Sequence, residues 1–371
     1  MKNLMEIKSF DGYGIKGKLA MPDGTSAVPK LVLYIHGSGA YTYDRQFRLP
    51  ADTRIPVDNE HNSFDFLADY LTDRGIAFFS YSTRGVSTST NLPLFVDINE
   101  DEYKQYLPLN SVDDVYYMIK SLKENGRLMN SKVYLCGWSE GAIIAPMAAE
   151  KYSDMVDGLF LVGYPNENMK DTVVWQNTGG PSMVFYKYHF DRDADGRVSR
   201  AEYDADPNGV VPTLLQNTSF DAIDINNDGY IDAIDFALIW KDVVGYSLDD
   251  LFSAVDRGDD GWLRSHFGVV GGVCAVPLTT AWLAQHFSLK SNYEILPTLN
   301  LPILIFHGAL DQNCDPDGVR RVQARFNELN KANLKVNIFN NHAHDLNYID
   351  IILKNTISEG MQALFDAIEG I

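Results

Sequence analysis

Residues 133–145 of this chain read Val-Tyr-Leu-Cys-Gly-Trp-Ser-Glu-Gly-Ala-Ile-Ile-Ala. An apolar run typical of a buried strand comes first, the motif Gly-x-Ser-x-Gly around Ser139 follows, and a helix-compatible run of small and apolar residues ends the stretch. This order indicates a nucleophile elbow, in which the serine sits on a sharp turn with strained backbone angles. Gly137 and Gly141 are needed because a Cβ at either position would clash with the neighbouring strand and helix. The stretch therefore predicts a strand that carries a serine nucleophile at its end.

Length and composition are those of a globular protein with room for one large domain and an additional module. The 371 residues are 45% hydrophobic and 22% charged. No apolar stretch reaches transmembrane length, and residues 1–6 lack the apolar core of a signal peptide. Cys136, Cys274 and Cys314 lie far apart in the sequence, which is typical of free thiols. We expect a cytoplasmic protein, or a secreted one if a leader has been removed.

The charge is strongly negative and unevenly distributed. The formal net charge of −19 argues against nucleic acids and anionic membranes as partners. Residues 191–260 contain 17 acidic and 5 basic side chains and therefore supply −12 of the total. Such a segment is usually a solvated surface, but here the spacing of its acids indicates metal binding, as argued below.

The apolar pattern predicts an α/β fold. Two alternating runs, residues 6–10 and 15–20, predict an antiparallel hairpin at the start of the chain. Short apolar runs then predict buried parallel strands at residues 31–35, 76–80, 133–136, 158–162, 303–306 and 336–339. Helical periodicity occurs at residues 64–74, 112–122 and 360–368. Strands that alternate with helices indicate a doubly wound, mostly parallel sheet, with its site beyond the carboxyl ends of the strands.

The alternation of strands and helices stops after residue 162 and resumes at residue 303. We therefore expect residues 1–165 and 296–371 to form the core of the fold. Residues 166–295 are then an inserted, mainly helical cap over the site. Within this cap, residues 277–287 have the pattern of an amphipathic helix, which either packs on the core or lines the pocket.

Two loops after predicted strands supply the partners that a serine nucleophile needs. A serine hydroxyl requires a base to take its proton, and the base requires a third group to orient it. Asp311 follows the strand predicted at 303–306, and His344 follows the strand predicted at 336–339. The chain order Ser, Asp, His is the order found after a nucleophile elbow.

These motifs resemble those of an α/β-hydrolase of the esterase and serine-peptidase-like kind, over roughly residues 1–165 and 296–371. The resemblance implies that Ser139 is the nucleophile, His344 the general base and then acid, and Asp311 the orienting carboxylate. His342 and Asp315 compete for the last two roles. We favour His344 because His-Asp-Leu resembles the family's motif after the final strand, and Asp311 because of its distance from the strand end.

The run His36-Gly37-Ser38-Gly39 follows a predicted strand and resembles the family's oxyanion loop. The resemblance implies that the backbone N–H groups of Ser38 and Glu140 bind the oxyanion, with Gly39 as a less favoured second donor. His36 and His307 are expected to be structural. The carboxylate of Glu140 is given a role only as a weaker alternative.

Residues 191–202 match the twelve-residue EF-hand calcium loop. Carboxylates occupy positions 1, 3 and 5, glycine occupies position 6, and a glutamate that can bind through both oxygens occupies position 12. Val198 at position 8 can pair with a partner loop. The expected ligands, with Arg197 acting through its carbonyl, are Asp191, Asp193, Asp195, Arg197 and Glu202.

Residues 224–235 repeat the pattern 33 residues later, with Ile231 at position 8. Aspartate replaces glutamate at position 12, which is similar to dockerin-type calcium repeats. The expected ligands are Asp224, Asn226, Asp228, Tyr230 and Asp235. We expect Ca²⁺ to fold the inserted segment, since unpaired carboxylates would repel one another. Regulation of access to the site by Ca²⁺ is the alternative.

The sequence thus predicts a serine hydrolase that cleaves a small-molecule ester through an acyl-enzyme, with thioester or peptide amide as less favoured substrates. The alternative is a calcium-dependent binding module on an inactive hydrolase scaffold, which would bind a protein partner through its acidic insertion.

Overall fold

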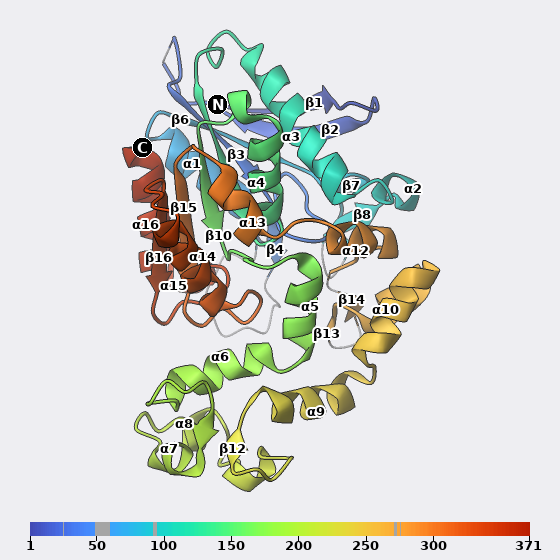
Figure 1. The fold of residues 1–371 in the computed structure, drawn as a ribbon. Helices are drawn as coiled ribbons and strands as arrows, with labels where there is room; N and C mark the ends of the chain where they lie inside the picture. Colours follow the sequence, from blue (N-terminus) through green and yellow to red (C-terminus); the bar gives the residue numbers. More distant parts are fainter. Residues whose placement is uncertain (25, 49–59, 92–94, 271–272, 275) are drawn as a thin grey trace.

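The structure is a computed structural model, and it describes residues 1–24, 26–48, 60–91, 95–270, 273–274 and 276–371. Its centre is an eight-stranded sheet in the order β1-β2-β6-β3-β9-β10-β15-β16 (Figure 1). The strands are β1 (Lys2–Lys8), β2 (Gly14–Ala20), β3 (Lys30–Ile35), β6 (Ile76–Tyr81), β9 (Lys132–Trp138), β10 (Gly158–Val162), β15 (Ile303–Gly308) and β16 (Leu334–Phe339). β2 pairs antiparallel with β1 and with β6, and all other neighbours are parallel. The predicted opening hairpin and mostly parallel sheet are confirmed.

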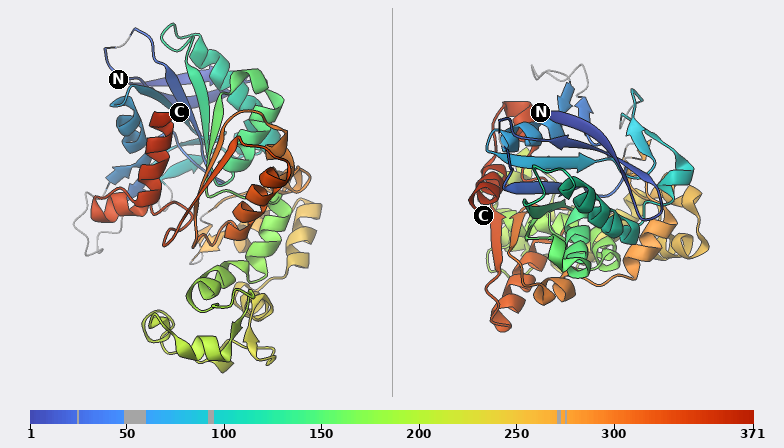
Figure 2. Two further views of the ribbon diagram at one scale, coloured as in Figure 1. Left: turned by 60° about the vertical axis from the view of Figure 1, so that its left-hand side comes forward. Right: turned by 90° about the horizontal axis from the view of Figure 1, so that it is seen from above.

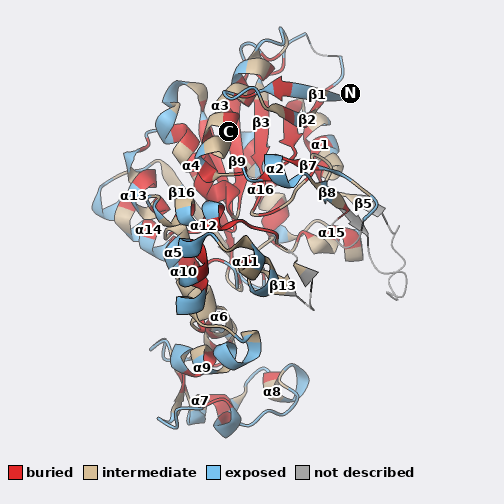
Figure 3. Cartoon of the chain, turned by 90° about the vertical axis from the view of Figure 1, so that its right-hand side faces the viewer, coloured by how far each residue is buried: buried red, intermediate tan, exposed pale blue. Residues whose placement is uncertain are grey.

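Strand β3 shows why the central strands are apolar at almost every position. Leu31, Leu33 and Ile35 pack into one core layer. Val32 and Tyr34 pack into the other, because successive side chains of a strand point to opposite faces. Both faces of the central strands are covered, so these strands appear as buried ribbon in Figure 3, whereas the edge strand β1 is largely exposed. Burial of each leucine or isoleucine side chain stabilises the fold by about 1.5–3 kcal/mol.

Helices cover both faces of the sheet (Figure 2). One core layer is completed by α3 (Pro108–Lys123), α4 (Gly141–Lys151) and α14 (Pro316–Glu328). The other is completed by α1 (Ser63–Thr72), α15 (Ile349–Lys354) and α16 (Glu359–Gly370). Polar side chains mark where helices begin: Asn62 accepts from the Asp65 amide at 3.0 Å, and Ser358 accepts from the Met361 amide at 3.2 Å.

The chain between β10 and β15 is mainly helical and extends beyond the carboxyl ends of the strands (Figure 1). Its helices are α5 (Met169–Asn177), α6 (Gly180–His189), α7 (Arg200–Ala205), α8 (Val210–Thr213), α9 (Ala233–Val244), α10 (Leu248–Arg257), α11 (Asp260–His266), α12 (Thr280–Phe287) and α13 (Asn292–Ile295). Its short strands are β11 (Val198–Ser199), β12 (Tyr230–Ile231), β13 (Val269–Val270) and β14 (Val273–Cys274). Aromatic and aliphatic side chains of α6, α7 and α9 form a separate small core. This part of the segment therefore packs around apolar side chains of its own.

The remaining described elements are short. They are β4 (Gln46–Arg48), β5 (Glu60–Asn62), β7 (Val86–Thr88), β8 (Val96–Ile98), α2 (Glu100–Tyr103) and the 3₁₀ turns η1 (Ser153–Met155), η2 (Phe220–Ala222) and η3 (Leu296–Thr298). Among the helices described, none combines the length and the apolar character needed to cross a bilayer.

Candidate active site

Ser139 lies at the turn between β9 and α4, with φ at +56°. This left-handed conformation is strained for a residue other than glycine, and it presents the serine at the apex of the turn. A Cβ at Gly137 would overlap the carbonyl of Gly141, and a Cβ at Gly141 would overlap the carbonyl of Ile35 in β3. The two glycines of the motif therefore allow the close approach of strand, turn and helix.

Asp311 and His344 lie in the loops that follow β15 and β16 and are joined by hydrogen bonds. Nδ1 of His344 lies 2.8 Å from Oδ2 and 3.0 Å from Oδ1 of Asp311. The carboxylate is completely buried, and its Oδ1 also accepts from the amides of Asn313 at 2.8 Å and Cys314 at 2.9 Å. This arrangement fixes the orientation of the imidazole, with Nδ1 directed toward the carboxylate.

The pair also shifts the pKa of both partners. Burial works against the charged form of His344, but the charge of Asp311 and their hydrogen bond outweigh it and raise the His344 pKa. Burial likewise works to raise the pKa of Asp311, but the attraction to His344 lowers it overall. The histidine is thus a stronger base than an isolated imidazole.

His342 and Asp315, the two competing residues, form hydrogen bonds elsewhere. Nε2 of His342 accepts from the Gly360 amide at 3.1 Å, and its Nδ1 lies 2.8 Å from the carbonyl of Asn340. Asp315 caps α14 by accepting from the Asp317 amide at 3.0 Å. The geometry therefore favours His344 and Asp311 over His342 and Asp315.

Ser139 and His344 lie at the same end of β10. The Ser139 amide donates to the carbonyl of Val162, the last residue of β10, at 2.9 Å. A Cβ on the next residue, Gly163, would lie 2.6 Å from Cε1 of His344. Among the described residues no hydrogen bond joins Ser139 Oγ to His344, and such bonds often tighten only when substrate is bound.

The predicted oxyanion donors flank the serine. A Cβ at Gly37 would lie 3.2 Å from Cβ of Ser139, so the loop that carries Ser38 adjoins the nucleophile. The amides of Ser38 and Glu140 have no acceptor within the described parts of the chain. The Gly39 amide, in contrast, donates to the hydroxyl of Tyr106 at 3.4 Å. Ser38 is therefore the better placed of the two loop donors.

No protein-family model and no curated protein matches the chain. Solved structures match it over almost its whole length. A highly thermostable carboxyl esterase from Bacillus coagulans, in complex with glycerol, superimposes with a TM-score of 0.53 at 15% identity, over 100% of this chain and 98% of that chain. The chain has the α/β-hydrolase fold. Est1E from Butyrivibrio proteoclasticus with bound ferulic acid gives a TM-score of 0.51 at 12% identity, over 99% and 96% of the two chains.

His36 and His307, two further histidines near the site of this α/β-hydrolase fold, are held by structural contacts. The His36 ring stacks on Tyr41 at 4.9 Å, and its Nδ1 lies 2.9 Å from the carbonyl of Gly37. His307 is fully buried; its Nδ1 accepts from the Tyr164 amide at 3.1 Å, and its Nε2 donates to the carbonyl of Cys314 at 3.2 Å. Burial lowers the pKa of both rings.

The sequence gives no partner for the Glu140 side chain, and the structure shows three. Its carboxylate accepts hydrogen bonds from Trp282 at 3.0 Å, from His286 at 2.9 Å and from the hydroxyl of Tyr106. Trp282 and His286 both belong to α12. Their four-residue spacing within the amphipathic run was the available signal, since residues four apart share one face of a helix.

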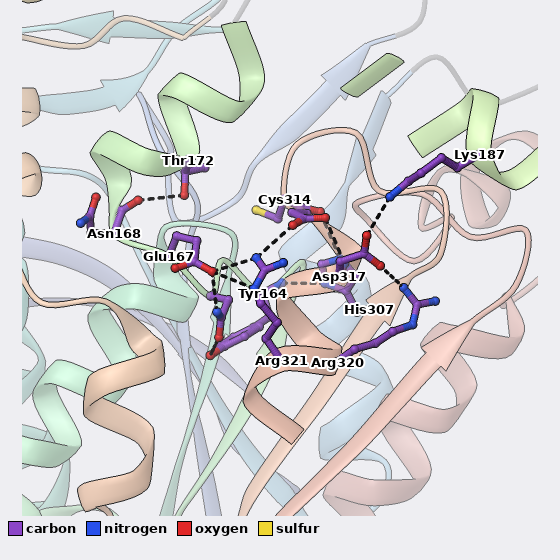
Figure 4. Close-up of polar contacts among 12 residues, drawn as sticks. Tyr164, Glu167, Asn168, Thr172, Lys187, His307, Cys314, Asp317, Arg320 and Arg321 are labelled. Atoms are coloured by element: carbon purple, nitrogen blue, oxygen red, sulfur yellow. Dashed lines mark hydrogen bonds and ion pairs between the residues drawn. The ribbon is translucent and has the colours of Figure 1, made fainter. Parts of the chain in front are cut away.

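Two ion pairs connect the segment after β10 to α14, close to the loop that carries Asp311 (Figure 4). Lys187 of α6 lies 2.7 Å from Asp317, and Arg321 of α14 lies 2.8 Å from Glu167. Burial works to raise the pKa of Asp317, but its bonds to Lys187 and Arg320 lower it overall. Ion pairs thus connect the helical segment to the core on the side of Asp311.

A cavity of about 280 Å³ lies beside the elbow, between β3, β9, α1 and α15. Trp138 and Asp345, the sequence neighbours of Ser139 and His344, contribute to its wall. Phe64, Leu67 and Ile352 make much of the remainder apolar.

The first acidic loop has the shape expected of a cation site. Asp191, Asp193 and Asp195 bring carboxylate oxygens within 4.8 Å of one another. Oδ1 of Asp191 is buried and has no partner among the described residues, which leaves it free to bind a cation. Glu202 turns into the loop, where it accepts from the Arg192 amide at 2.9 Å. The Arg197 side chain lies over the ring of Tyr230, at 3.8 Å, and the predicted contact of Arg197 to an ion is through its backbone carbonyl.

The second loop closes in the same way and pairs with the first. Asp224 accepts from the Asp228 amide at 3.2 Å, and Asn226 accepts from the same amide at 2.9 Å. Asp235 is fully buried and accepts from the Ile225 amide at 2.9 Å. Two backbone registers, Val198 with Ile231 and Ser199 with Tyr230, join the loops as β11 and β12. The pairing lies at position 8 of each loop.

Proposed function

We propose that this protein is a serine hydrolase that cleaves carboxylic esters of small molecules through an acyl-enzyme. The observation that carries the proposal is the 2.8 Å contact between His344 and the buried Asp311, at the sheet edge that also holds the strained Ser139. A positive φ at a buried turn is costly, and such strain persists mainly where a function requires it.

In the proposed reaction, Ser139 Oγ attacks the ester carbonyl carbon while its proton passes to Nε2 of His344. The carbonyl electron pair moves onto oxygen, which the amides of Ser38 and Glu140 stabilise. The intermediate collapses by breaking the bond to the alcohol oxygen, and that oxygen takes the proton from His344. Water then attacks the acyl-enzyme by the same route and releases the acid. Asp311 keeps the Nδ1–H of His344 in place throughout.

An ester is favoured over an amide because the solved structures of the same fold include a carboxyl esterase and Est1E with bound ferulic acid. We further propose that the cavity beside Trp138 takes one compact apolar group of such a substrate, although its wall is formed by the sequence neighbours of Ser139 and His344 and not by these two residues. A panel of p-nitrophenyl esters from acetyl to dodecanoyl, assayed beside p-nitroanilides of peptides, tests this choice. We expect the highest kcat/KM for short acyl groups, and a preference for peptide amides would contradict the proposal.

Labelling by a fluorophosphonate probe tests the nucleophile. We expect stoichiometric labelling of the intact protein and none of the Ser139→Ala variant. Ser265→Ala removes an exposed hydroxyl of α11 and is the matched control, which should label like the parent chain. A folded protein that remains unlabelled, or a Ser139→Ala variant that labels equally, would contradict the proposal.

We also propose that Ca²⁺ binds both acidic loops and stabilises the segment between β10 and β15. The donor set fits a hard cation, since carboxylate and carbonyl oxygens are the ligands that Ca²⁺ prefers. Asp191 with its unpartnered Oδ1, together with Glu202, would hold the ion in the first loop. Asp224 and Asp235 would do so in the second. The ion would offset the repulsion between these carboxylates, and the serine mechanism requires no metal.

A second candidate function is binding of a protein partner by the acidic segment. It is favoured by large apolar side chains that are exposed there, including Leu214, Ile234, Leu238 and Val243. Pull-down with and without chelator, next to an esterase assay, separates the two functions. Calcium-dependent capture of a defined partner without any turnover would favour the binding module.

A further inference from the structure

The carboxylate of Glu140 is buried at the base of the proposed oxyanion site. Only 2% of the residue is exposed, and three donors from two other parts of the chain converge on it. A buried carboxylate is costly unless its oxygens are satisfied, so this one depends on all three contacts.

One pair of contacts connects Glu140 to α12. Oε1 accepts from the indole N–H of Trp282 at 3.0 Å and from Nε2 of His286 at 2.9 Å. Both side chains are 1% exposed, and Nδ1 of His286 has no partner among the described residues. The bond to Glu140 is therefore the one polar contact of this ring within the described part of the chain, beside its packing on Trp282. These contacts fix the side chain of the residue whose amide follows the nucleophile.

The third contact reaches the opposite side of the oxyanion site. Oε2 accepts from the hydroxyl of Tyr106, and this hydroxyl in turn accepts from the Gly39 amide at 3.4 Å. Burial beside Glu140 raises the pKa of Tyr106 well above its ordinary value, so the hydroxyl keeps the proton that it donates. The turn that carries Ser38 is thus connected to Glu140 through one tyrosine.

We propose that the Glu140 carboxylate is a positioning residue that sets the spacing of the two oxyanion donors, the amides of Ser38 and Glu140. It acts on the Glu140 amide through α12 and on the Ser38 amide through Tyr106 and Gly39. The inference rests on the proposed serine hydrolase function, because only that function forms an oxyanion at this place. Donors must lie where the negative charge develops, and small displacements of such groups reduce the rate strongly.

Three variants separate the contacts. Glu140→Gln keeps the size of the side chain but replaces one acceptor oxygen with a donor, so that Tyr106 or His286 meets an N–H group. Tyr106→Phe removes the hydroxyl that donates to Glu140 and accepts from the Gly39 amide, and it leaves both contacts of Glu140 to α12 in place. Asp114→Asn is the matched control: it neutralises a buried carboxylate whose Oδ1 lies 2.6 Å from Arg84, on a helix that carries no residue of the proposed site.

The readouts distinguish positioning from stability. Hydrolysis of a short p-nitrophenyl ester gives kcat and KM, and a trifluoromethyl ketone that forms an oxyanion on Ser139 reports transition-state binding. For Glu140→Gln we expect kcat to fall by about 10- to 100-fold and the affinity for the ketone to fall by a similar factor. KM should change by less than about threefold, since the ground-state carbonyl gains little from these donors. Tyr106→Phe should show the same pattern with a loss of about 3- to 10-fold.

The control variant should lose stability and keep its activity. Asp114→Asn should lower the melting temperature while kcat and the ketone affinity stay within about twofold of the parent values. If Glu140→Gln and Tyr106→Phe both retain the parent kcat and ketone affinity, the inference is overturned. It is also overturned if kcat, KM and melting temperature change together in all three variants. A parent protein that neither turns over esters nor reacts with fluorophosphonate would instead overturn the proposed function itself.

Discussion

Gly163 adjoins the imidazole of His344 so closely that a side chain at residue 163 would collide with it. A Cβ there would lie 2.6 Å from Cε1 and 2.8 Å from Nδ1 of His344. Gly163 also has a φ of +55°, which L side chains rarely adopt. The residue after β10 therefore leaves the space in which the proposed general base sits.

This contact predicts the effect of Gly163→Ala. The added methyl group would displace the imidazole from Asp311 and from Ser139, so we expect kcat to fall by about 100-fold. The strained φ should cost about 1–2 kcal/mol of stability in addition. Gly126→Ala is the control, because a Cβ at Gly126 meets nothing within 4 Å and its activity should not change. An unchanged kcat in Gly163→Ala would place the base elsewhere.

The raised pKa of His344 predicts a particular pH dependence. The histidine accepts a proton from Ser139 only when it is neutral, so kcat/KM should rise with pH as His344 loses its proton. Because the Asp311 contact raises the His344 pKa above its ordinary value of 6.5, the midpoint of this rise should lie above 6.5.

Asp311→Asn checks the cause of that shift. Loss of the carboxylate should move the midpoint of the kcat/KM profile to lower pH and reduce kcat by about 10⁴-fold, because the imidazole loses its orientation. A residual rate with an unshifted midpoint would show that Asp311 does not act on the titrating group.

His342 and His344 have different hydrogen-bond partners, so their mutation should have different effects. His342→Gln breaks a bridge between Asn340 and Gly360, and we expect a loss of about 1–3 kcal/mol in unfolding free energy with fluorophosphonate labelling retained. His344→Gln should remain folded and lose labelling. Chemical denaturation and labelling of both variants make the comparison. The reverse result would exchange the two histidines.

Calcium binding by the acidic loops predicts a stability that depends on free Ca²⁺. At a free concentration about 100 times the dissociation constant, each occupied site should stabilise the segment by about 2.7 kcal/mol, so chelation should lower the melting temperature. Glu202→Gln should weaken this response. Asp242→Asn, at an exposed aspartate of α9 outside both loops, should not. Thermal unfolding with and without chelator measures the effect, and identical curves would show that the loops bind no calcium.

The sheet and the positions of Ser139, Asp311 and His344 were predictable because each depends on a local pattern. A strand buried on both faces must be apolar throughout, as β10 is, and a loop that follows such a strand must lie at the sheet edge. The choice of His344 over His342 came from a resemblance, and the structure supplies the physical reason in the partners of each ring.

The hydrogen bonds of Glu140 could not be predicted from sequence patterns near this residue. Its partners Tyr106 and His286 lie 34 and 146 residues away in the sequence, and no short motif indicates that they meet. The short pairs β11–β12 and β13–β14 lie where few strand signals were found, because two-residue strands carry too little pattern to recognise. The two acidic loops also differ in the element that comes before them: the helix α6 precedes the first loop, whereas a short 3₁₀ turn, η2, precedes the second.

The most direct test of the account is to trap the acyl-enzyme and locate it. The protein is mixed with a p-nitrophenyl ester, quenched in acid during the first turnover, digested and analysed by mass spectrometry. The account predicts one added acyl group on the peptide that contains Ser139, and its absence when Asp311 is replaced by Asn. Acylation of another residue, or hydrolysis with no acylated Ser139 at any time point, would contradict it.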